Sequence, residues 1–203
     1  MASAAQERGV TVREATAADT EAVAQTLARS FYDDPVFSHF LPDDATRLAK
    51  LVRVWRILFR LGLPHKACFT TEGYESITLW RPPNGWHVSL LDYIINGPAL
   101  IGIFGTGLGR VLSTTGGMEK IHPHTPHWYL QTIGTDPAKQ GKGYGGVIMR
   151  SQLAVADAAH LPCYLESSKD TNIPIYQSFG FQVTGEMQVP DGPKIWPMWR
   201  DAR

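Results

Sequence analysis

The chain has 203 residues and a formal net charge of zero, with 43% apolar and 19% charged residues. This length is typical of one domain with an ample core, and the balanced charge argues against a nucleic-acid footprint or an anionic-membrane patch. Cys68 and Cys163 lie too far apart to suggest a disulfide framework, and the first nine residues hold no apolar stretch of signal-peptide length. We therefore expect a cytoplasmic protein.

The N-terminal segment predicts a strand followed by a helix. Residues 10–14 alternate between valine and polar side chains, which indicates a strand. Thr16 or Asp19 can cap the helix that follows, and its apolar positions continue to Ser30.

An aromatic segment and a long helix come next. Residues 31–42 are rich in aromatic side chains and broken by two prolines, so we expect a loop or short helix over the core. Asp33 and Asp34 in this segment could attract an ammonium group, or equally serve as solvated caps. Residues 43–61 carry an apolar stripe of helical period.

The middle of the chain predicts a hairpin and an irregular apolar insert. The hairpin strands are 66–71 and 76–80, joined by a Glu-Gly-Tyr-Glu turn. Residues 86–119 are apolar but interrupted by glycines and by Gly97-Pro98. The uninterrupted apolar runs are shorter than the ~20 residues of a membrane span, so we expect two or three short helices. They would form a wall of a ligand pocket, or else a dimer contact.

Three histidines precede the next strand in the pattern H-x-H-x-x-H, at His122, His124 and His127. Prolines make this segment irregular, and no nearby carboxylate or cysteine completes a metal shell. We therefore expect no metal, and favour a histidine near a substrate.

The central motif of the chain is a strand, a glycine loop and a helix between Trp128 and Ala159. Trp128–Thr135 is apolar and β-branched, Asp136-Pro137 forms a turn, and the apolar residues after Gly146 have helical spacing. The first turn of a helix has unpartnered N–H groups and partial positive charge, and glycines let an anion approach the backbone. The motif predicts a phosphate site, although a glycine-rich packing turn is the simpler alternative. The loop residues are Gln140, Gly141, Lys142, Gly143, Tyr144, Gly145 and Gly146.

Two other phosphate loops fit this stretch less well. A Walker loop requires Ser or Thr after its lysine, and Gly143 follows Lys142 here. A dinucleotide fingerprint matches Gly141, Gly143 and Gly146, with Glu166 near the position of a ribose-binding acid. However, a spacer separates the strand from the glycines, and too little chain follows to build the remaining parallel strands. A dinucleotide-binding oxidoreductase is therefore the less favoured alternative.

The loop and the segments after it resemble the GNAT superfamily of N-acetyltransferases. Gln140–Gly145 has the form [Q/R]-x-x-G-x-[G/A] of the acetyl-CoA pyrophosphate loop, and Asn172–Phe181 resembles the N-x-x-x-Y…GF segment of the family. The last third particularly resembles puromycin N-acetyltransferase and its bacterial relatives. This resemblance implies one domain over residues 1–203, of the α/β (α+β) class. It has a mixed, mostly antiparallel twisted sheet that splays between its two central strands, and residues 86–119 form a helical insert on the acceptor side.

The resemblance also implies a site and a reaction. Backbone groups of Ile133, Gly134 and Thr135 would pair with the pantetheine of acetyl-CoA, and an N–H there would face the thioester carbonyl. We expect Gly134 to mark a bulge or a close backbone approach. Tyr176 would protonate the leaving thiolate, while Asn172 would contact the pantetheine or cap the helix. Glu166, near the end of the next strand, would be the base or a structural carboxylate.

The predicted function is acetyl-CoA-dependent transfer of an acetyl group to a primary amine of a small molecule, without a metal, by direct attack in a ternary complex. We expect no nucleic-acid or membrane partner, and a monomer or homodimer. A non-catalytic acyl-CoA-binding sensor is the main alternative.

Overall fold

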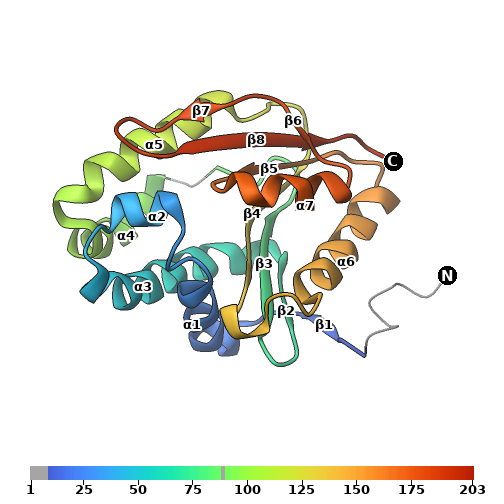
Figure 1. The fold of residues 1–203 in the computed structure, drawn as a ribbon, viewed down its shortest axis with the longest axis horizontal. Coiled ribbons are helices and arrows are strands. Elements are labelled where there is room, and N and C mark those ends of the chain that lie inside the picture. The colour runs from blue at the N-terminus through green and yellow to red at the C-terminus, as the bar shows by residue number, and fades with distance from the viewer. Residues whose placement is uncertain (1–8, 88–89) are drawn as a thin grey trace.

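The computed structural model describes residues 9–87 and 90–203, and these residues form one open sheet flanked by helices (Figure 1). The strand order is β1-β2-β3-β4-β5-β8-β6, with β7 paired to β8. The strands are β1 Val12–Glu14, β2 Cys68–Thr71, β3 Ser76–Arg81, β4 Trp128–Thr135, β5 Cys163–Ser167, β6 Gln182–Val183, β7 Met187–Gln188 and β8 Lys194–Arg200. The α-helices are α1 Thr20–Ser30, α2 Pro35–Phe40, α3 Asp44–Gly62, α4 Leu90–Phe104, α5 Leu108–Ile121, α6 Tyr144–Ala158 and α7 Ile173–Ser178.

The sheet splits between β4 and β5, its two central strands. They pair in parallel only from Trp128 to Leu130 on β4 and from Cys163 to Leu165 on β5. Beyond Leu130, β4 stays paired with β3 alone, and Figure 1 shows β5 and β8 running across the direction of β3 and β4. The predicted mixed, mostly antiparallel and splayed sheet is confirmed. The dinucleotide alternative is wrong, because β4 and β5 are the single parallel pair among the described strands.

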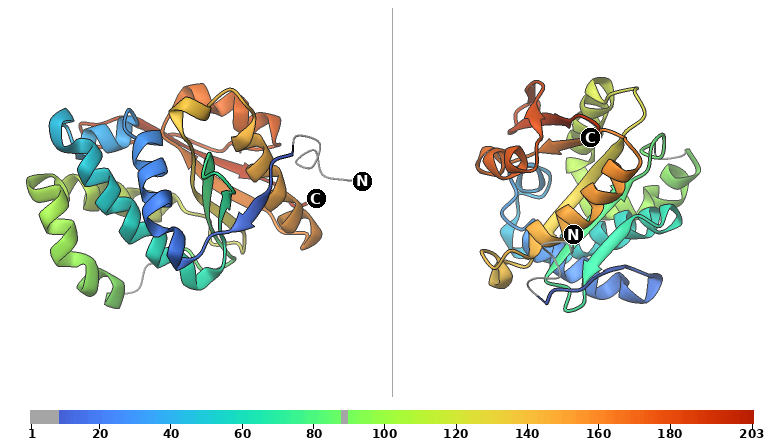
Figure 2. Two further views of the ribbon diagram at one scale, coloured as in Figure 1. Left: turned by 90° about the horizontal axis from the view of Figure 1, so that it is seen from below. Right: turned by 90° about the vertical axis from the view of Figure 1, so that its right-hand side faces the viewer.

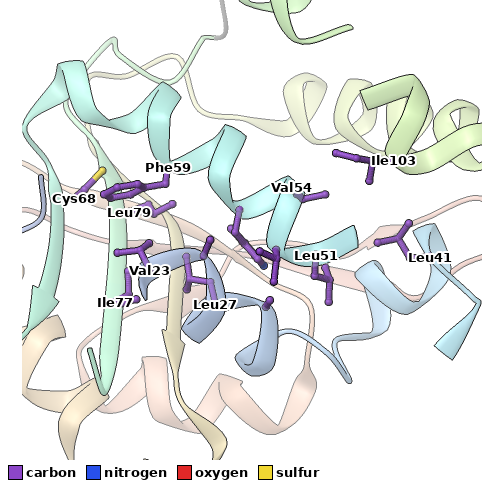
Figure 3. Packing of buried hydrophobic residues seen from close by; sticks show 14 of the residues in the cluster. Val23, Leu27, Leu41, Leu51, Val54, Phe59, Cys68, Ile77, Leu79 and Ile103 are labelled. Atoms are coloured by element: carbon purple, nitrogen blue, oxygen red, sulfur yellow. The ribbon is translucent and has the colours of Figure 1, made fainter. Parts of the chain in front are cut away.

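Helices cover both faces of the sheet, and each face has its own core (Figure 2). On one face α1 and α3 pack against β3, with Leu27, Phe59 and Leu79 among the fully buried side chains (Figure 3). On the other face α6 packs against β3 and β4, and its Met149 and Leu153 meet Leu165 of β5. Each core also contains one free cysteine, Cys68 in the first and Cys163 in the second, and both are buried.

A bulge interrupts the ladder between β3 and β4 close to the point of splitting. Leu79 pairs with Thr132 and Trp80 with Leu130, so Gln131 is the additional residue on β4. We expected Gly134 to mark a bulge or a close approach of backbone. The structure shows the second, toward α1: a Cβ atom on Gly134 would lie 2.8 Å from both Leu27 Cδ2 and Ser30 Oγ. The glycine therefore lets α1 pack closely on β4.

The insert forms two helices, α4 and α5, which lie beyond α3 on the side away from α6 (Figures 1 and 2). Pro98 does not end α4, contrary to our expectation of a break there. The break falls instead at Gly105, which has a φ of 52° and begins a 3₁₀ turn. By length and composition alone, the helical stretch Ile94–Ile121 qualifies as a membrane span. The turn at Gly105 interrupts it between α4, which has 15 residues from Leu90 to Phe104, and α5, which has 14.

Candidate active site

A cleft of about 970 Å³ follows the gap between β4 and β5 and extends to the start of α6. Its walls come from the end of α1, the separated parts of both strands, the glycine loop and α7. The predicted residues Ile133, Gly134, Thr135, Gln140, Gly141, Gly143, Tyr144, Gly145, Gly146, Glu166, Asn172 and Tyr176 all line it. Of the predicted set, Lys142 is absent from the described lining. The fold thus gathers in one cleft residues that are up to 43 positions apart, from Ile133 to Tyr176.

The glycine loop presents backbone N–H groups to this cleft. Gly141 and Gly143 have φ values of 73° and 87°, which favour glycine, and Gly143 is the N-cap of α6. No side chain caps this helix, and its first backbone bond of the described set runs from Val147 N to Gly143 O. The N–H groups of the first turn therefore remain available, at the positive end of the helix dipole. Such an arrangement can bind a phosphate group.

The polar side chains of the loop are turned onto the backbone of the segment that precedes it. Gln140 Nε2 donates to Thr135 O at 3.3 Å, and Lys142 Nζ donates to Ala138 O at 3.4 Å. The predicted side-chain donors therefore stabilise the loop in this structure. Arg29 of α1 forms a 2.6 Å ion pair with Asp136, at the turn that joins β4 to the loop.

Tyr176 lies on α7, with its ring 6.3 Å from that of Phe181. Burial, followed by the negative charge of Asp34, raises the pKa of the phenol above its usual value. The phenol is therefore protonated at neutral pH. Asn172 occupies the N-cap position of α7 but makes no side-chain cap hydrogen bond, so the capping role that we considered for it is wrong, and its amide stays free to face the cleft.

The two aspartates at the end of α1 line the same cleft and differ in environment. Asp34 is buried, caps α2 by accepting from Val36 N at 3.0 Å, and accepts a hydrogen bond from Ser168 Oγ. Burial raises the pKa of this carboxyl group. Asp33 is exposed and pairs with Lys169 at 2.9 Å. Asp34 is thus a cap, as one of our alternatives stated, but it is buried and not solvated as that alternative expected. Its carboxylate also acts on the phenol of Tyr176.

Glu166 is the penultimate residue of β5, directly beyond the last residue paired with β4. Its side chain is 3% exposed, although the residue lines the cleft. The carboxylate lies 3.6 Å from His122 Nδ1, and Oε1 has no hydrogen-bond partner among the described residues. The charge of Glu166 adds to burial in raising the pKa of both Tyr129 and Tyr164. The carboxylate therefore lies close to these two phenols, at the point where β4 and β5 separate.

Two of the three predicted histidines lie together against Glu166. His122 and His127 are buried, with their Nε2 atoms 3.1 Å apart, whereas His124 is exposed. The fold thus supplies a nearby carboxylate that the local sequence did not show. Within the described parts of the chain, no group of three or more potential ligands has the geometry to hold a metal ion.

Ser30, Ser168 and Phe179 also line the cleft, and the sequence analysis did not single them out. Only the fold shows that their side chains reach the cleft. Conversely, no described lining residue of this cleft comes from the insert 86–119. Its expected place beside the acceptor remains a prediction.

The amino-acid sequence is similar to those of known acetyltransferases. A model of the acetyltransferase (GNAT) family matches residues 56–181. An uncharacterised N-acetyltransferase of Schizosaccharomyces pombe is 27% identical over 177 residues, covering 81% of this chain and 71% of the yeast protein. The N-alpha-acetyltransferase RimI of Mycobacterium tuberculosis is 32% identical over 82 residues, which cover 40% of this chain and 52% of that protein.

Solved structures share the fold over nearly the whole chain. A crystal structure of a histone acetyltransferase HPA2 and related acetyltransferase from Corynebacterium glutamicum has a TM-score of 0.70 at 25% identity, covering 96% of this chain and 97% of that one. The polyamine N-acetyltransferase of Drosophila melanogaster has a TM-score of 0.62 at 15% identity, with 95% and 99% covered. The second likeness concerns the fold alone.

Proposed function

The chain belongs to the acetyltransferase (GNAT) family, and we propose that this acyltransferase moves the acetyl group of acetyl-CoA onto a primary amine of a small molecule. The amine attacks the thioester directly while both substrates are bound. The observation that carries this proposal is the continuous cleft, which begins at the unpartnered N–H groups of α6 and ends where β4 leaves β5, beside Tyr176. Its length and polarity suit a ligand with phosphates at one end and an extended arm.

The residues for acetyl-CoA divide into two groups. The loop Gln140–Gly146 would hold the pyrophosphate through backbone N–H groups. Beyond it, the edge of β4 that β5 leaves unpaired offers backbone groups of Ile133, Gly134 and Thr135. These groups would pair with the pantetheine arm like an added strand and direct an N–H at the thioester oxygen. Asn172, with its amide free of a cap, supplies a further hydrogen bond.

Acetyl transfer also requires an acid and a base. Tyr176 is the acid in this proposal, because its raised pKa keeps a proton available for the departing thiolate. Glu166 is the base in this proposal, because its carboxylate lines the cleft at the apex of the split and its Oε1 has no hydrogen-bond partner among the described residues. That the protein acts in the cytoplasm, as a monomer or homodimer and without a metal, stays a prediction.

The acceptor end of the cleft favours a compact amine on an aromatic or apolar body. Phe31 and Tyr32 line it beside Asp33 and Asp34, so rings can pack on the body while a carboxylate faces the ammonium group. A polycation needs many acidic contacts, and Asp33 is already paired with Lys169. We therefore predict that small aromatic or aminonucleoside-like amines, puromycin among the candidates, react faster than aminoglycosides or histone-type peptides.

An amine panel with acetyl-CoA tests both the activity and this selectivity. The release of CoA thiol is measured with aromatic amines, puromycin, agmatine, an aminoglycoside and a lysine-rich peptide at equal concentration. Faster release with the aromatic set supports the proposal. A clear preference for the polycations contradicts our account of the acceptor end. CoA binding without thiol release from any amine would favour the alternative, an acyl-CoA-binding sensor.

A further inference from the structure

A chain of three buried polar side chains runs from the apex of the cleft toward the loop before β4. Glu166 Oε1 lies 3.6 Å from His122 Nδ1, and His122 Nε2 lies 3.1 Å from His127 Nε2. His127 Nδ1 lies 2.6 Å from the carbonyl oxygen of Thr125, which is exposed. The two histidines are 5% and 3% exposed, so the chain connects the cleft to the surface through the interior.

The hydrogen-bond partners define where the protons of this chain reside. A carbonyl oxygen only accepts, so His127 Nδ1 carries a proton, and the Nε2 of the neutral ring is an acceptor. His122 Nε2 must then donate to it. This leaves His122 Nδ1 as a lone pair opposite the Glu166 carboxylate. One proton position in the chain is therefore vacant, and it lies at the Glu166 end.

Aromatic rings pack around the two histidines of this chain. Trp86 stacks on His122 at 3.9 Å between centroids, and Tyr129 and Tyr164 contact the same ring edge-on at 4.8 Å. Trp199 of β8 packs on His127 at 5.5 Å.

The other titratable groups near the chain lie on β3, β4, β5 and α4 and in the segment before α4. They are the phenols of Tyr129 and Tyr164, the buried Arg81 with Asp92 near it, and His87, which stacks on the far side of Trp86. The pKa of both phenols is raised, and Arg81 is a cation. These three groups therefore do not act as bases near neutral pH. The pKa of His127 is lowered, chiefly by burial, so a positive charge does not persist at the far end of the chain.

We propose that His122 and His127 are positioning residues for Glu166, and that the three side chains together take up the proton released by the acceptor amine. This inference rests on the proposed function. It adds two residues of the H-x-H-x-x-H motif, which has no part in binding the cofactor.

The proton balance of the step is simple. The N–H bond of the attacking amine breaks and an O–H bond forms at Glu166, or, by transfer along the contact, an N–H bond at His122 Nδ1. The vacant proton position is then filled, and the net charge of Glu166 and His122 together rises by one. His122 shares its Nε2 proton with His127, which spreads this charge over both rings. Once the products leave, the proton passes from Glu166 to water in the cleft, and the starting tautomers are restored.

The first test uses the wild-type protein without a substrate. Nitrogen-15 NMR of labelled histidines distinguishes the two neutral tautomers of each ring. We expect His127 as the Nδ1–H tautomer and His122 as the Nε2–H tautomer. Finding His127 as the Nε2–H tautomer would overturn the chain, whatever the activity of the enzyme.

The second test compares His122→Gln with His124→Gln. Glutamine can still donate to His127 but offers no basic nitrogen to Glu166, whereas His124 is exposed in the same motif and serves as the control. We expect His122→Gln to lower kcat by roughly 10²-fold, within the range of general acid–base effects. Two sites that share one proton bind it at least as tightly as one site, so the acidic limb of the kcat/KM profile should move to lower pH. The His124→Gln enzyme should keep the wild-type profile.

CoA affinity and the thermal midpoint show whether His122→Gln is folded. A folded variant with the wild-type kcat and acidic limb would show that the histidines are only structural. If His122→Gln does not fold, the tautomers in the wild-type protein decide. If the tautomers are as expected but no amine is acetylated, the proposed function fails, and the catalytic part of this inference fails with it.

Discussion

The glycine loop and the Glu166–His122–His127 chain serve the same cleft but are built in opposite ways. The loop is seven consecutive residues, and its function lies in backbone N–H groups that two positive-φ glycines expose. The proton chain consists of side chains from β5, the end of α5 and the segment before β4, and no two of its members are adjacent in sequence. A contiguous backbone site tolerates side-chain changes but not a change of φ. A dispersed side-chain site depends on single atoms.

The largest effect on kcat is expected at Tyr176, where the function depends on a single side-chain atom, the phenol oxygen. Tyr176→Phe removes the proton donor and nothing of the loop, so kcat should fall by ~10²–10⁴-fold while CoA affinity stays unchanged. Steady-state kinetics together with calorimetry measure both quantities. Tyr74→Phe, at a turn outside the described lining of the cleft, is the control. Wild-type turnover in the Tyr176→Phe enzyme would refute the assignment.

Gly143→Val should have the next largest effect and should act on binding. A non-glycine residue in the left-handed region costs roughly 1–2 kcal/mol, so the free variant loop should relax away from this conformation. Restoring the conformation when CoA binds would then weaken binding by on the order of 10-fold. The side chain also enters where phosphate must touch the backbone, so the loss of CoA affinity in calorimetry should be larger still. Gly116→Val makes the same change on α5, where a Cβ atom meets nothing within 4 Å, and should leave CoA affinity unchanged. Equal affinities in the two folded variants would show that the loop is a packing turn.

The smallest expected effect concerns Asp34, which is both a cap and a cleft residue. Burial raises its pKa, so the unfolded chain releases this proton at a lower pH than the folded protein does. Stability is therefore lost as pH rises from the ordinary aspartate value of ~3.9 through the raised folded pKa. Asp34→Asn keeps an oxygen for the cap and removes the charge. Its thermal midpoint relative to wild type should rise as the pH increases above the ordinary aspartate value of ~3.9.

For a domain of this size, a change of 1 kcal/mol in the free energy of unfolding shifts the thermal midpoint by roughly 2–4 °C. The neighbouring Asp33→Asn is the control, because Asp33 is exposed and its pair with Lys169 is a surface ion pair. Its midpoint difference should stay nearly constant with pH. A constant difference for Asp34→Asn as well would mean that the buried carboxylate is not the source of the effect.

The same contrast explains what the sequence could predict. The loop was predictable because glycine spacing, a preceding strand and a following helical period are all local signals, and the family resemblance placed Tyr176, Asn172 and Glu166 in order after it. Helix α3 and the hairpin were predictable from periodicity. The bulge at Gln131 depends on pairing between β3 and β4, and the close approach at Gly134 depends on the packing of α1. Neither has a local signal, so the sequence offered only the glycine itself as a possible place for a bulge.

The histidine motif shows the other limit of the sequence. H-x-H-x-x-H lacked a local carboxylate, and the carboxylate that completes the cluster comes from β5, 39 residues after His127. The insert was equally opaque, because a proline within a long apolar run signals a break only where backbone packing does not compensate for it. Gly105 carries the break instead.

The two buried cysteines determine how the chemistry of this protein can be followed. Cys68 and Cys163 are its only thiols, and burial raises the pKa of the first to about 11 and of the second to about 12. Thiolate, the reactive form, is therefore scarce on the protein at neutral pH, and neither sulfur is accessible. A chromogenic disulfide added to a reaction mixture should accordingly report the thiol of the product without a background from the folded polypeptide. Slow colour development in the absence of substrate would then measure unfolding.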